Sequence, residues 1–440
     1  MHQLQLSLDE GESPAQPLLR EARPYQPLPA ANSEGLRRFL VDLHIHVGRN
    51  GRGKQVKITA SPDLTLENIV RYAWQRKGLD IIGVIDCACT GVLQDLRQLI
   101  DRGELLELPE GGLRHRDQIT LIPGAEVEAV ESHGGVSHHL CYFPYLRNLA
   151  EFSRVMGGYI TNMELSSQRC GLPARELLAV VQSCGGLLVP AHAFTPHKSV
   201  YGNAADSCQQ LFGDLFAEIP ALELGLSATS ELADRLPELA ELSFLTNSDA
   251  HSLERIAREY TVMQLAAPNF RELVLGWRRQ MGRHIEANYG VDPSLGRYHR
   301  SYCLRCQQPR VGEGAVLACP ECQASLPKDF VRGVFDRILQ LAPGPSLSPA
   351  HRPPYRMQVP LNQQPGLGKS RLDQLVAAFG SEMAVLHQAT PAQLVPLVGP
   401  ALSQQIVAAR EGRVQLSAGA GGRYGKLLGL QDEQRQLTLF

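Results

Sequence analysis

The 440-residue sequence lacks the features that would place it in a membrane or outside the cell. No segment approaches the run of about 20 apolar residues that a membrane-spanning helix needs. The first residues are polar and include Asp9, Glu10 and Glu12, unlike a secretory signal peptide. We therefore expect a cytoplasmic protein that does not associate with membranes.

The sequence also lacks an excess of charge of either sign. Its formal net charge is −2, so the whole chain does not resemble a protein that binds nucleic acid through general basicity. Any such function must rest on local features. At this length we expect two or more domains, the first of which could be a large α/β unit.

A disulfide framework is absent as well, although the chain has ten cysteines. Four of them form two C-x2-C pairs separated by twelve residues, a spacing that predicts one tetrahedral structural zinc site. The others are scattered through apolar or motif-bearing segments, and we expect them to be free thiols in a reducing compartment. The four predicted zinc ligands are Cys303, Cys306, Cys319 and Cys322.

Strand-like and helix-like segments alternate from residue 37 to about 265. Repeated βα units with apolar strands imply a parallel sheet covered by helices, and the length favours a barrel over an open sheet. The expected fold class is therefore α/β. Strands are expected at 39–46, 79–86, 119–127, 139–143, 187–191, 221–225 and 242–246, and helices at 65–77, 90–102, 146–156, 173–184 and 269–284.

Polar side chains collect where the expected strands end. His44 and His46 share one face of the first strand, because side chains alternate with period 2. An α/β barrel carries its chemistry on the face where its strands end, so these side chains could converge. Several imidazoles with three carboxylates exceed the needs of one metal ion, which predicts a cluster of two or three ions. The predicted metal-binding and catalytic residues are His44, His46, Asp86, Glu126, His138, His192, Asp249 and His251.

Clustered divalent ions would activate a water molecule and clamp the attacking and leaving oxygens of a phosphoryl displacement. No G-x-S-x-G motif or Ser-His-Asp order supports a nucleophilic serine instead. The motifs DLHIH, GVID, PGAEVE, His138 before LCYFP, PAHAFTP and TNSDAH resemble, in order, those of the PHP (polymerase and histidinol phosphatase) superfamily. This resemblance covers about residues 38–265. It implies a distorted (β/α)7 barrel that holds up to three zinc or manganese ions, with magnesium as a further possibility, and hydrolyses phosphoesters.

The chain departs from this pattern on the second strand, where many relatives have Asp-His and this sequence reads Asp86-Cys87-Ala88-Cys89. Cys87 could be a thiolate ligand, since thiolate suits zinc, or a buried structural thiol. The number of metal ions is therefore open. His133 and His139 flank the preferred ligand His138 as alternatives.

Beyond residue 265 we expect an arginine-rich connector with the zinc ribbon (266–341), a proline-rich linker with little packed structure (342–365) and a small helical domain (366–412). The arginines could contact phosphate or form an ordinary solvated face. The helical domain resembles a tandem helix-hairpin-helix unit, whose turns present backbone N–H groups to DNA phosphates; a helical oligomerisation domain is the alternative. A Walker A loop is excluded by Gln363, where that motif needs glycine. The predicted DNA-binding residues are Arg278, Arg279, Arg283, Arg300, Gly366, Gly368, Lys369 and Gly399.

The segment 413–440 is expected to be a tail that carries QLTLF. This pentapeptide resembles the QLxLF motif with which bacterial repair and replication proteins bind the sliding clamp. The resemblance implies that two apolar side chains fill a cleft of the clamp while a glutamine bonds at its rim. The predicted clamp-binding residues are Gln436, Leu437, Leu439 and Phe440.

The order of barrel, connector, ribbon and hairpins resembles the endonuclease Q family, in its bacterial branch, across nearly the whole chain. The resemblance implies a DNA repair endonuclease that nicks on the 5′ side of a deaminated base (uracil, hypoxanthine or xanthine) or an abasic site, after extruding the base. The alternatives are a small-molecule phosphatase of the histidinol phosphatase kind and a non-catalytic DNA-binding scaffold. The candidates for the lesion pocket are Ser167, Gln168, Phe194 and His197.

Overall fold

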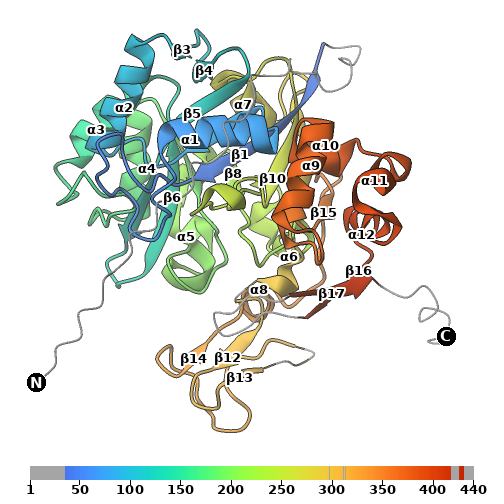
Figure 1. Ribbon diagram of the computed structural model, residues 1–440. Coiled ribbons are helices and arrows are strands. Elements are labelled where there is room, and N and C mark those ends of the chain that lie inside the picture. Colours follow the sequence, from blue (N-terminus) through green and yellow to red (C-terminus); the bar gives the residue numbers. More distant parts are fainter. Residues whose placement is uncertain (1–34, 297, 311, 313, 418–425, 431–440) are drawn as a thin grey trace, which may run out of the picture.

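The computed structural model describes residues 35–296, 298–310, 312, 314–417 and 426–430. A barrel-like α/β body carries the ribbon at one end and a group of helices on one side (Figure 1). Within these ranges no helix is both long and apolar enough to cross a membrane. The sequence predicts a flexible N-terminal tail at residues 1–36, of which residues 1–34 lie outside the described residues. The predicted order of α/β barrel, four-cysteine ribbon and C-terminal helices is confirmed.

The predicted strands and helices of the barrel lie within a few residues of their expected positions. Thr65 caps the first helix by accepting a hydrogen bond from Asn68 N, and Gly78 ends it in a left-handed conformation after a π-helical turn. The strands are β1 (Arg37–Ile45), β2 (Ile81–Val84), β5 (Ile119–Val130), β6 (Val136–Tyr142), β7 (Leu187–Pro190), β8 (Ala221–Glu223) and β9 (Ser243–Leu245). The predicted helices are α1 (Leu66–Arg71), α2 (Thr90–Asp101), α3 (Leu146–Met156) and α4 (Ala174–Ser183). The short helices α5 (Cys208–Phe212) and α6 (Ser230–Ala233) were not predicted.

The strand directions differ from the parallel sheet that the sequence predicted. β1, β2 and β5 are parallel neighbours, as are β8 and β9. β6, however, is antiparallel to both β5 and β7. The reason is that β5 and β6 are joined by a short turn containing Gly134, which adopts φ +89°, and not by a helix that could return the chain to the starting edge. The start of β6 therefore lies at the same end of the barrel as the ends of β5 and β7.

The main sheet also extends beyond the predicted boundary at residue 265. β10 (Tyr260–Leu265) pairs antiparallel with β1, and β11 (His284–Gly290) pairs antiparallel with β10. The helix expected at 269–284 is accordingly too long, because α7 (Phe270–Trp277) ends before a turn in which Arg279, Met281 and Gly282 have positive φ. The short strands β3 (Leu105–Glu107) and β4 (Leu113–His115), absent from the sequence prediction, extend the other edge of the sheet.

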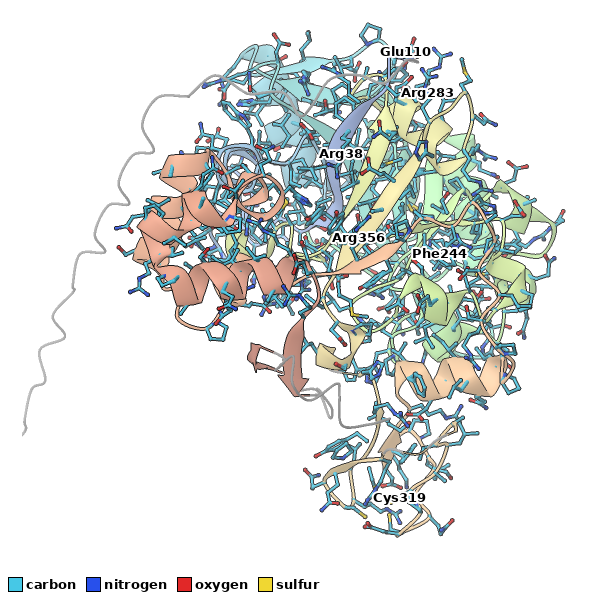
Figure 2. The ribbon with its side chains drawn as sticks, turned by 90° about the vertical axis from the view of Figure 1, so that its right-hand side faces the viewer. Arg38, Glu110, Phe244, Arg283, Cys319 and Arg356 are labelled. Carbon is cyan, nitrogen blue, oxygen red and sulfur yellow. The ribbon has the colours of Figure 1, made fainter. Side chains whose placement is uncertain are left out.

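The ribbon is a small three-stranded unit with its own apolar cluster. Cys319 lies at its tip, at the opposite end of the molecule from Arg283 (Figure 2). The following helix fastens the ribbon to the barrel, since Arg337 donates to Tyr201 O (2.7 Å) and pairs with Asp206 (2.5 Å). The elements are β12 (Ser301–Cys303), β13 (Gln308–Arg310), β14 (Phe330–Val331) and α8 (Val334–Leu341).

The proline-rich segment is packed against the barrel, so the prediction of a loosely structured linker is wrong. Its strand β15 (Tyr355–Met357) pairs in parallel with β11 and becomes the last strand on that side of the main sheet. The side chain of Arg352 is buried against the barrel. Its guanidinium group pairs with the carboxylate of Asp234 (2.8 Å) and lies 3.7 Å from the ring centroid of Phe244. It also donates to the carbonyl oxygens of Leu239, Ala240 and Leu242. Prolines keep the segment extended without preventing these side-chain anchors.

The C-terminal helices form two helical hairpins that dock on the barrel (Figure 1). Lys77 and Arg76, at the end of the first barrel helix, both pair with Glu382 (2.8 and 3.1 Å). Tyr260 Oη and His387 Nε2 lie 2.6 Å apart across the same interface. The elements are α9 (Lys369–Phe379), α10 (Glu382–His387), α11 (Pro391–Val398) and α12 (Pro400–Arg410), followed by the paired strands β16 (Val414–Ser417) and β17 (Lys426–Leu430).

Candidate active site

Two groups of potential metal ligands lie side by side where the barrel strands end. The first is formed by His44, His46 and Asp249, and the second by Glu126, His138 and His192, with the ligand atoms of each group within 4.8 Å of one another. His138 belongs here, although it comes at the start of its strand, because β6 runs in the opposite direction to β5 and β7.

Glu126 joins the two groups. Its Oε1 lies 2.8 Å from His138 Nδ1 and 3.5 Å from His192 Nε2 in its own group. The same oxygen is 3.6 Å from His44 Nε2, and Oε2 is 3.8 Å from His46 Nε2, in the first group. A carboxylate placed between two sets of imidazoles is suited to bridge two cations.

The geometry and charge of the first group fit a divalent metal ion. The Nε2 atoms of His44 and His46 are buried and have no hydrogen-bond partner among the described residues. Each lies 3.5 Å from Asp249 Oδ1, and ligands bonded to tetrahedral zinc at about 2.0–2.1 Å would be roughly 3.3–3.4 Å apart. Burial disfavours a charge on His44, yet Glu223 and Asp249 raise its pKa to about 10. This surplus of negative charge attracts cations.

The two histidines of the first strand are held by carboxylates behind them. His44 Nδ1 lies 3.0 Å from Glu223 Oε1, and that oxygen also accepts a hydrogen bond from Asn247 Nδ2. His46 Nδ1 lies 3.1 Å from Asp86 Oδ1, and Val47 N donates to the other oxygen of Asp86. Such partners fix the ring orientation and leave Nε2 directed at the site. Asp86 thus lies behind His46 and outside both ligand groups.

The loop that carries Asp249 is supported by buried charged residues. Asp42 accepts hydrogen bonds from Ser248 N (3.0 Å) and Ala257 N (2.9 Å). Arg258 Nε donates to Ser248 O at 2.6 Å. Asp249 itself has φ +45°, a conformation that non-glycine residues adopt only when their surroundings impose it. The carboxylate position is therefore set by the folded loop.

Three further predictions concern residues around these groups. His251 packs against His46 with the rings tilted and their centroids 4.5 Å apart, and burial lowers its pKa to about 4, so it is a neutral imidazole beside the first group. Cys87 is fully buried in the main apolar cluster, which favours the structural-thiol alternative. His139 points away from Glu126 and bonds Ser137 Oγ, and His133 bonds Ala204 O, so His138 is the member of this trio that faces the site.

A lysine that was not among the predicted site residues completes the centre. Lys57 Nζ lies 3.0 Å from Glu126 Oε2 and 2.5 Å from Ser167 Oγ, while Ser167 donates to the same carboxylate oxygen. Burial opposes its charge, but Glu126 and Asp86 raise the pKa of Lys57. These two carboxylates favour the charged ammonium form of Lys57 next to the two ligand groups.

A small pocket lies beside the carboxylates of Asp86 and Glu126. Ser167 and Gln168 line it, as predicted for the lesion pocket, together with the apolar side chains Phe152 and Met156. The other two candidates are not among its lining residues. Phe194 is buried and stacks on Tyr201 (5.0 Å), and His197 packs against Tyr298 (5.4 Å).

The four arginines predicted to bind DNA make contacts within the protein. Arg283 is bound by Glu272 (3.0 Å), and Arg300 pairs with the buried carboxylate of Asp336 (3.2 Å). Arg279 bonds Glu241, and Arg278 donates to the carbonyl oxygen of Glu218. These contacts attach the connector to the barrel and the ribbon to its helix, which weakens the prediction that the four side chains bind phosphate.

The glycine turns of the helical unit are, by contrast, open to solvent. Gly366 and Gly399 have φ +80° and +82°, and a Cβ added at either glycine, or at Gly368, would meet nothing within 4 Å. Lys369 is exposed at the start of α9, directly after this turn. These backbones are accessible to a ligand as large as a DNA strand.

The four ribbon cysteines form the third potential metal site. Cys303 and Cys322 have sulfur atoms 3.5 Å apart, and those of Cys306 and Cys319 are 3.8 Å apart. Zinc bonded tetrahedrally to four sulfurs at about 2.3 Å would separate them by roughly 3.8 Å. The cysteine set therefore fits structural zinc. The predicted clamp-binding segment, Gln436–Phe440, lies outside the described residues.

Glu223, Glu128 and Lys57 are the site residues that sequence reasoning missed. Glu223 is a charged residue inside the apolar strand ALELGL, which is a detectable signal for a buried function. Glu128 follows two residues after Glu126 on the same face of β5, and its carboxylate lies 3.3 Å from His138 Nε2. Lys57 is in a loop, where no periodicity could have indicated its direction.

Comparison with known proteins agrees with this architecture. No model of a protein family matches the chain. The uncharacterised protein YqxK of Bacillus subtilis is 41% identical over 395 residues, which are 89% of this chain and all of that protein. The structure is similar to that of the lesion-specific endonuclease PfuEndoQ from Pyrococcus furiosus, with a TM-score of 0.75 and 30% identity over 92% of this chain and 97% of that one. It is equally similar (TM-score 0.75, 30% identity, 90% and 97% coverage) to endonuclease Q in complex with a 27-mer duplex substrate with an abasic lesion at the active site. The chain therefore belongs to the endonuclease Q family.

Proposed function

We propose that this protein is a metal-dependent DNA repair endonuclease that nicks DNA beside a damaged nucleotide. The observation that carries this proposal is the pair of adjacent ligand groups that share Glu126, within a chain similar over nine-tenths of its length to an endonuclease with a lesion duplex at its active site. We propose the 5′ side of a deaminated base or abasic site as the position of the nick.

The proposed chemistry is hydrolysis of a phosphodiester by water. His44, His46 and Asp249 would hold one divalent ion and Glu126, His138 and His192 another, with zinc favoured by the imidazole ligands. Two such ions, when bound, would make a bound water acidic enough to ionise near neutral pH and would stabilise charge on the phosphate. Glu223 and Asp86 hold the rings of His44 and His46 in the orientation that ligation needs. The four-cysteine ribbon would bind one further zinc ion.

The small pocket beside Ser167 and Gln168 is our candidate site for a base taken out of the duplex, which would enter as the pocket widens on binding. It adjoins the carboxylates Asp86 and Glu126, so a nucleotide seated there would place its phosphate next to the ligand groups. Extrusion costs less at a mismatched or abasic position, because pairing and stacking are already weakened there. The open turns at Gly366 and Gly399 would bind backbone phosphates of the same duplex through their N–H groups.

Two finer proposals concern a protein partner and the location of the protein in the cell. The QLTLF segment supports binding to the bacterial sliding clamp. Deleting 436–440 should abolish clamp binding, measured by calorimetry, while leaving the nicking of short duplexes unchanged, since the apolar anchors of such a peptide supply most of its affinity. Unchanged clamp affinity after the deletion would refute this proposal. The ten cysteines, which form no disulfide among the described residues, support a reducing, cytoplasmic location.

The test of the main function uses end-labelled duplexes that contain one uracil, hypoxanthine or abasic site, with an undamaged duplex as the control. The protein is loaded with zinc, manganese or magnesium before mixing. We expect one nick immediately 5′ of the lesion and an intact control. Equal cutting of all duplexes would indicate a non-specific nuclease, hydrolysis of a free phosphomonoester alone would indicate a phosphatase, and no cutting of any substrate would favour a binding scaffold.

A further inference from the structure

We propose that the ammonium group of Lys57 is the third cation of the catalytic centre and contacts a non-bridging oxygen of the scissile phosphate. This inference rests on the proposed function. It starts from the two oxygens of Glu126: Oε1 lies 2.8–3.6 Å from nitrogens of His44, His138 and His192, and Oε2 lies 3.0 Å from Lys57 Nζ, with His46 Nε2 3.8 Å away. On the Oε2 side of the shared carboxylate, the positive charge is thus supplied by the side chain of Lys57.

Lys57 is fixed in this position by the backbone on both of its sides. Lys57 N donates to Val47 O (2.9 Å), one residue after His46. Val56 N donates to Gly48 O (2.9 Å), and Val56 O accepts from Ser166 N (3.0 Å). The loop with the lysine, the strand with the histidines and the loop with Ser167 are therefore tied together. A long, flexible side chain held by such contacts is already organised for catalysis before substrate binds.

The surroundings of the Lys57 ammonium group favour a direct contact with the substrate. Its side chain is 14% exposed, so it is shielded but still reached by solvent, and its partner Ser167 lines the small pocket beside Glu126. Ser167 has φ +51°, an unfavourable conformation for a serine, and that conformation accompanies the hydroxyl's contact with both Lys57 and Glu126. Strain of this kind is found where the surrounding structure imposes a functional geometry.

The chemistry assigned to Lys57 is electrostatic. Hydrolysis adds the hydroxyl of one water to phosphorus, breaks the bond from phosphorus to the leaving oxygen and delivers one proton to that oxygen. Lys57 keeps its own proton throughout. Its charge would offset the negative charge that develops on the phosphate oxygens, as a fixed donor does in an oxyanion hole.

The experiment compares Lys57→Met, Lys57→Arg and the control Lys54→Met in the full-length, metal-loaded protein. Lys54 is an exposed lysine of the same loop. We expect Lys57→Met to lower the single-turnover nicking rate about 10²–10³-fold, the loss that follows removal of one such donor, with duplex affinity and melting temperature close to wild type. Lys57→Arg should recover part of the rate, and Lys54→Met should behave as wild type.

Two measurements separate this role from a structural one. Elemental analysis of the wild type and of Lys57→Met should give two metal ions per chain beyond the ribbon zinc. In addition, sulfur substituted for one non-bridging oxygen of the scissile phosphate should slow the wild type and add little to the defect of Lys57→Met, because the contact it disturbs is already lost.

Several outcomes would overturn the assignment: three metal ions in the wild-type barrel, loss of metal from Lys57→Met, an arginine variant as slow as the methionine variant, or a sulfur effect of equal size in both proteins. If the wild type nicks no duplex, the proposed function fails. The metal count still tests the third-cation assignment in that case, with two ions in favour and three against.

Discussion

Glu259 is a buried carboxyl group that should make the stability of this protein depend on pH. It directly precedes β10 and is fully shielded from solvent. One oxygen accepts a hydrogen bond from Val291 N (2.9 Å), and the other has no hydrogen-bond partner among the described residues. Burial is the main reason that the pKa of Glu259 is raised from 4.5 to about 8. The folded protein therefore holds a proton here that the unfolded chain releases.

The sign and size of the effect follow from this difference. Between pH 4.5 and 8 the folded state binds more protons at Glu259 than the unfolded state, so its contribution to stability falls as the pH rises and levels off above pH 8. One pKa unit corresponds to about 1.4 kcal/mol, so the loss between pH 5 and pH 8 is about 3–4 kcal/mol. Glu259→Gln, which is neutral and of nearly equal volume, removes this dependence.

The assay is urea unfolding of the wild type and of Glu259→Gln at several pH values and constant ionic strength. Fluorescence of the buried Trp277 is a suitable signal. The free energy of unfolding of the variant, relative to the wild type, should rise with pH by about 3–4 kcal/mol between pH 5 and pH 8. A difference that stays constant over this range would show that Glu259 has the same charge in both states and would refute the reasoning.

Three further changes test other parts of the structure. Asp249→Asn should abolish nicking and lower the metal content of the barrel while leaving the ribbon zinc in place, and near wild-type nicking by this variant would contradict the assignment of the first ligand group. Lys369→Met should weaken binding of damaged and undamaged duplexes alike and lower the slope of log affinity against log salt by about one; an unchanged slope would remove Lys369 from the interface. Arg352→Met should destabilise the protein by about 3–5 kcal/mol, because it leaves Asp234 as a buried, uncompensated charge. Adding Asp234→Asn should recover part of that loss, and simple additivity of the two changes would show that the pair is not coupled.

Local patterns explain why much of the barrel could be predicted from the sequence. The helix at Leu146–Met156 begins and ends at the predicted residues, and the histidines of β1 share a face because strand alternation requires it. The direction of β6 could not be predicted in the same way, since it depends on a short turn that replaces a helix. The buried position of Arg352 also could not be predicted, because its partners Asp234 and Phe244 are distant in sequence. In the sequence, an isolated arginine among prolines looks like a solvent-exposed one.

The same limit applies to the candidate site. The six residues of the two ligand groups were all predicted, because imidazoles and carboxylates at strand ends are visible in sequence. Residues that act behind or beside them were not: Glu223 contacts His44 across 179 positions of the chain, and Lys57 reaches Glu126 from a loop. Only the folded backbone brings such partners together.

The ion pairs between the first barrel helix and Glu382 have a consequence for which DNA molecules this protein can process. They anchor the hairpin turns at one position relative to the ligand groups. If these turns bind backbone phosphates as proposed, they would contact the duplex at a fixed distance from the cleaved bond. A damaged nucleotide near the end of a duplex would lack the stretch of backbone that the hairpin turns are proposed to bind. Cleavage of such a lesion should be slow when the missing duplex is on the side of the hairpins, and should proceed at the usual rate when the missing duplex is on the opposite side. Lesions near the two ends of a duplex would then be cleaved at different rates.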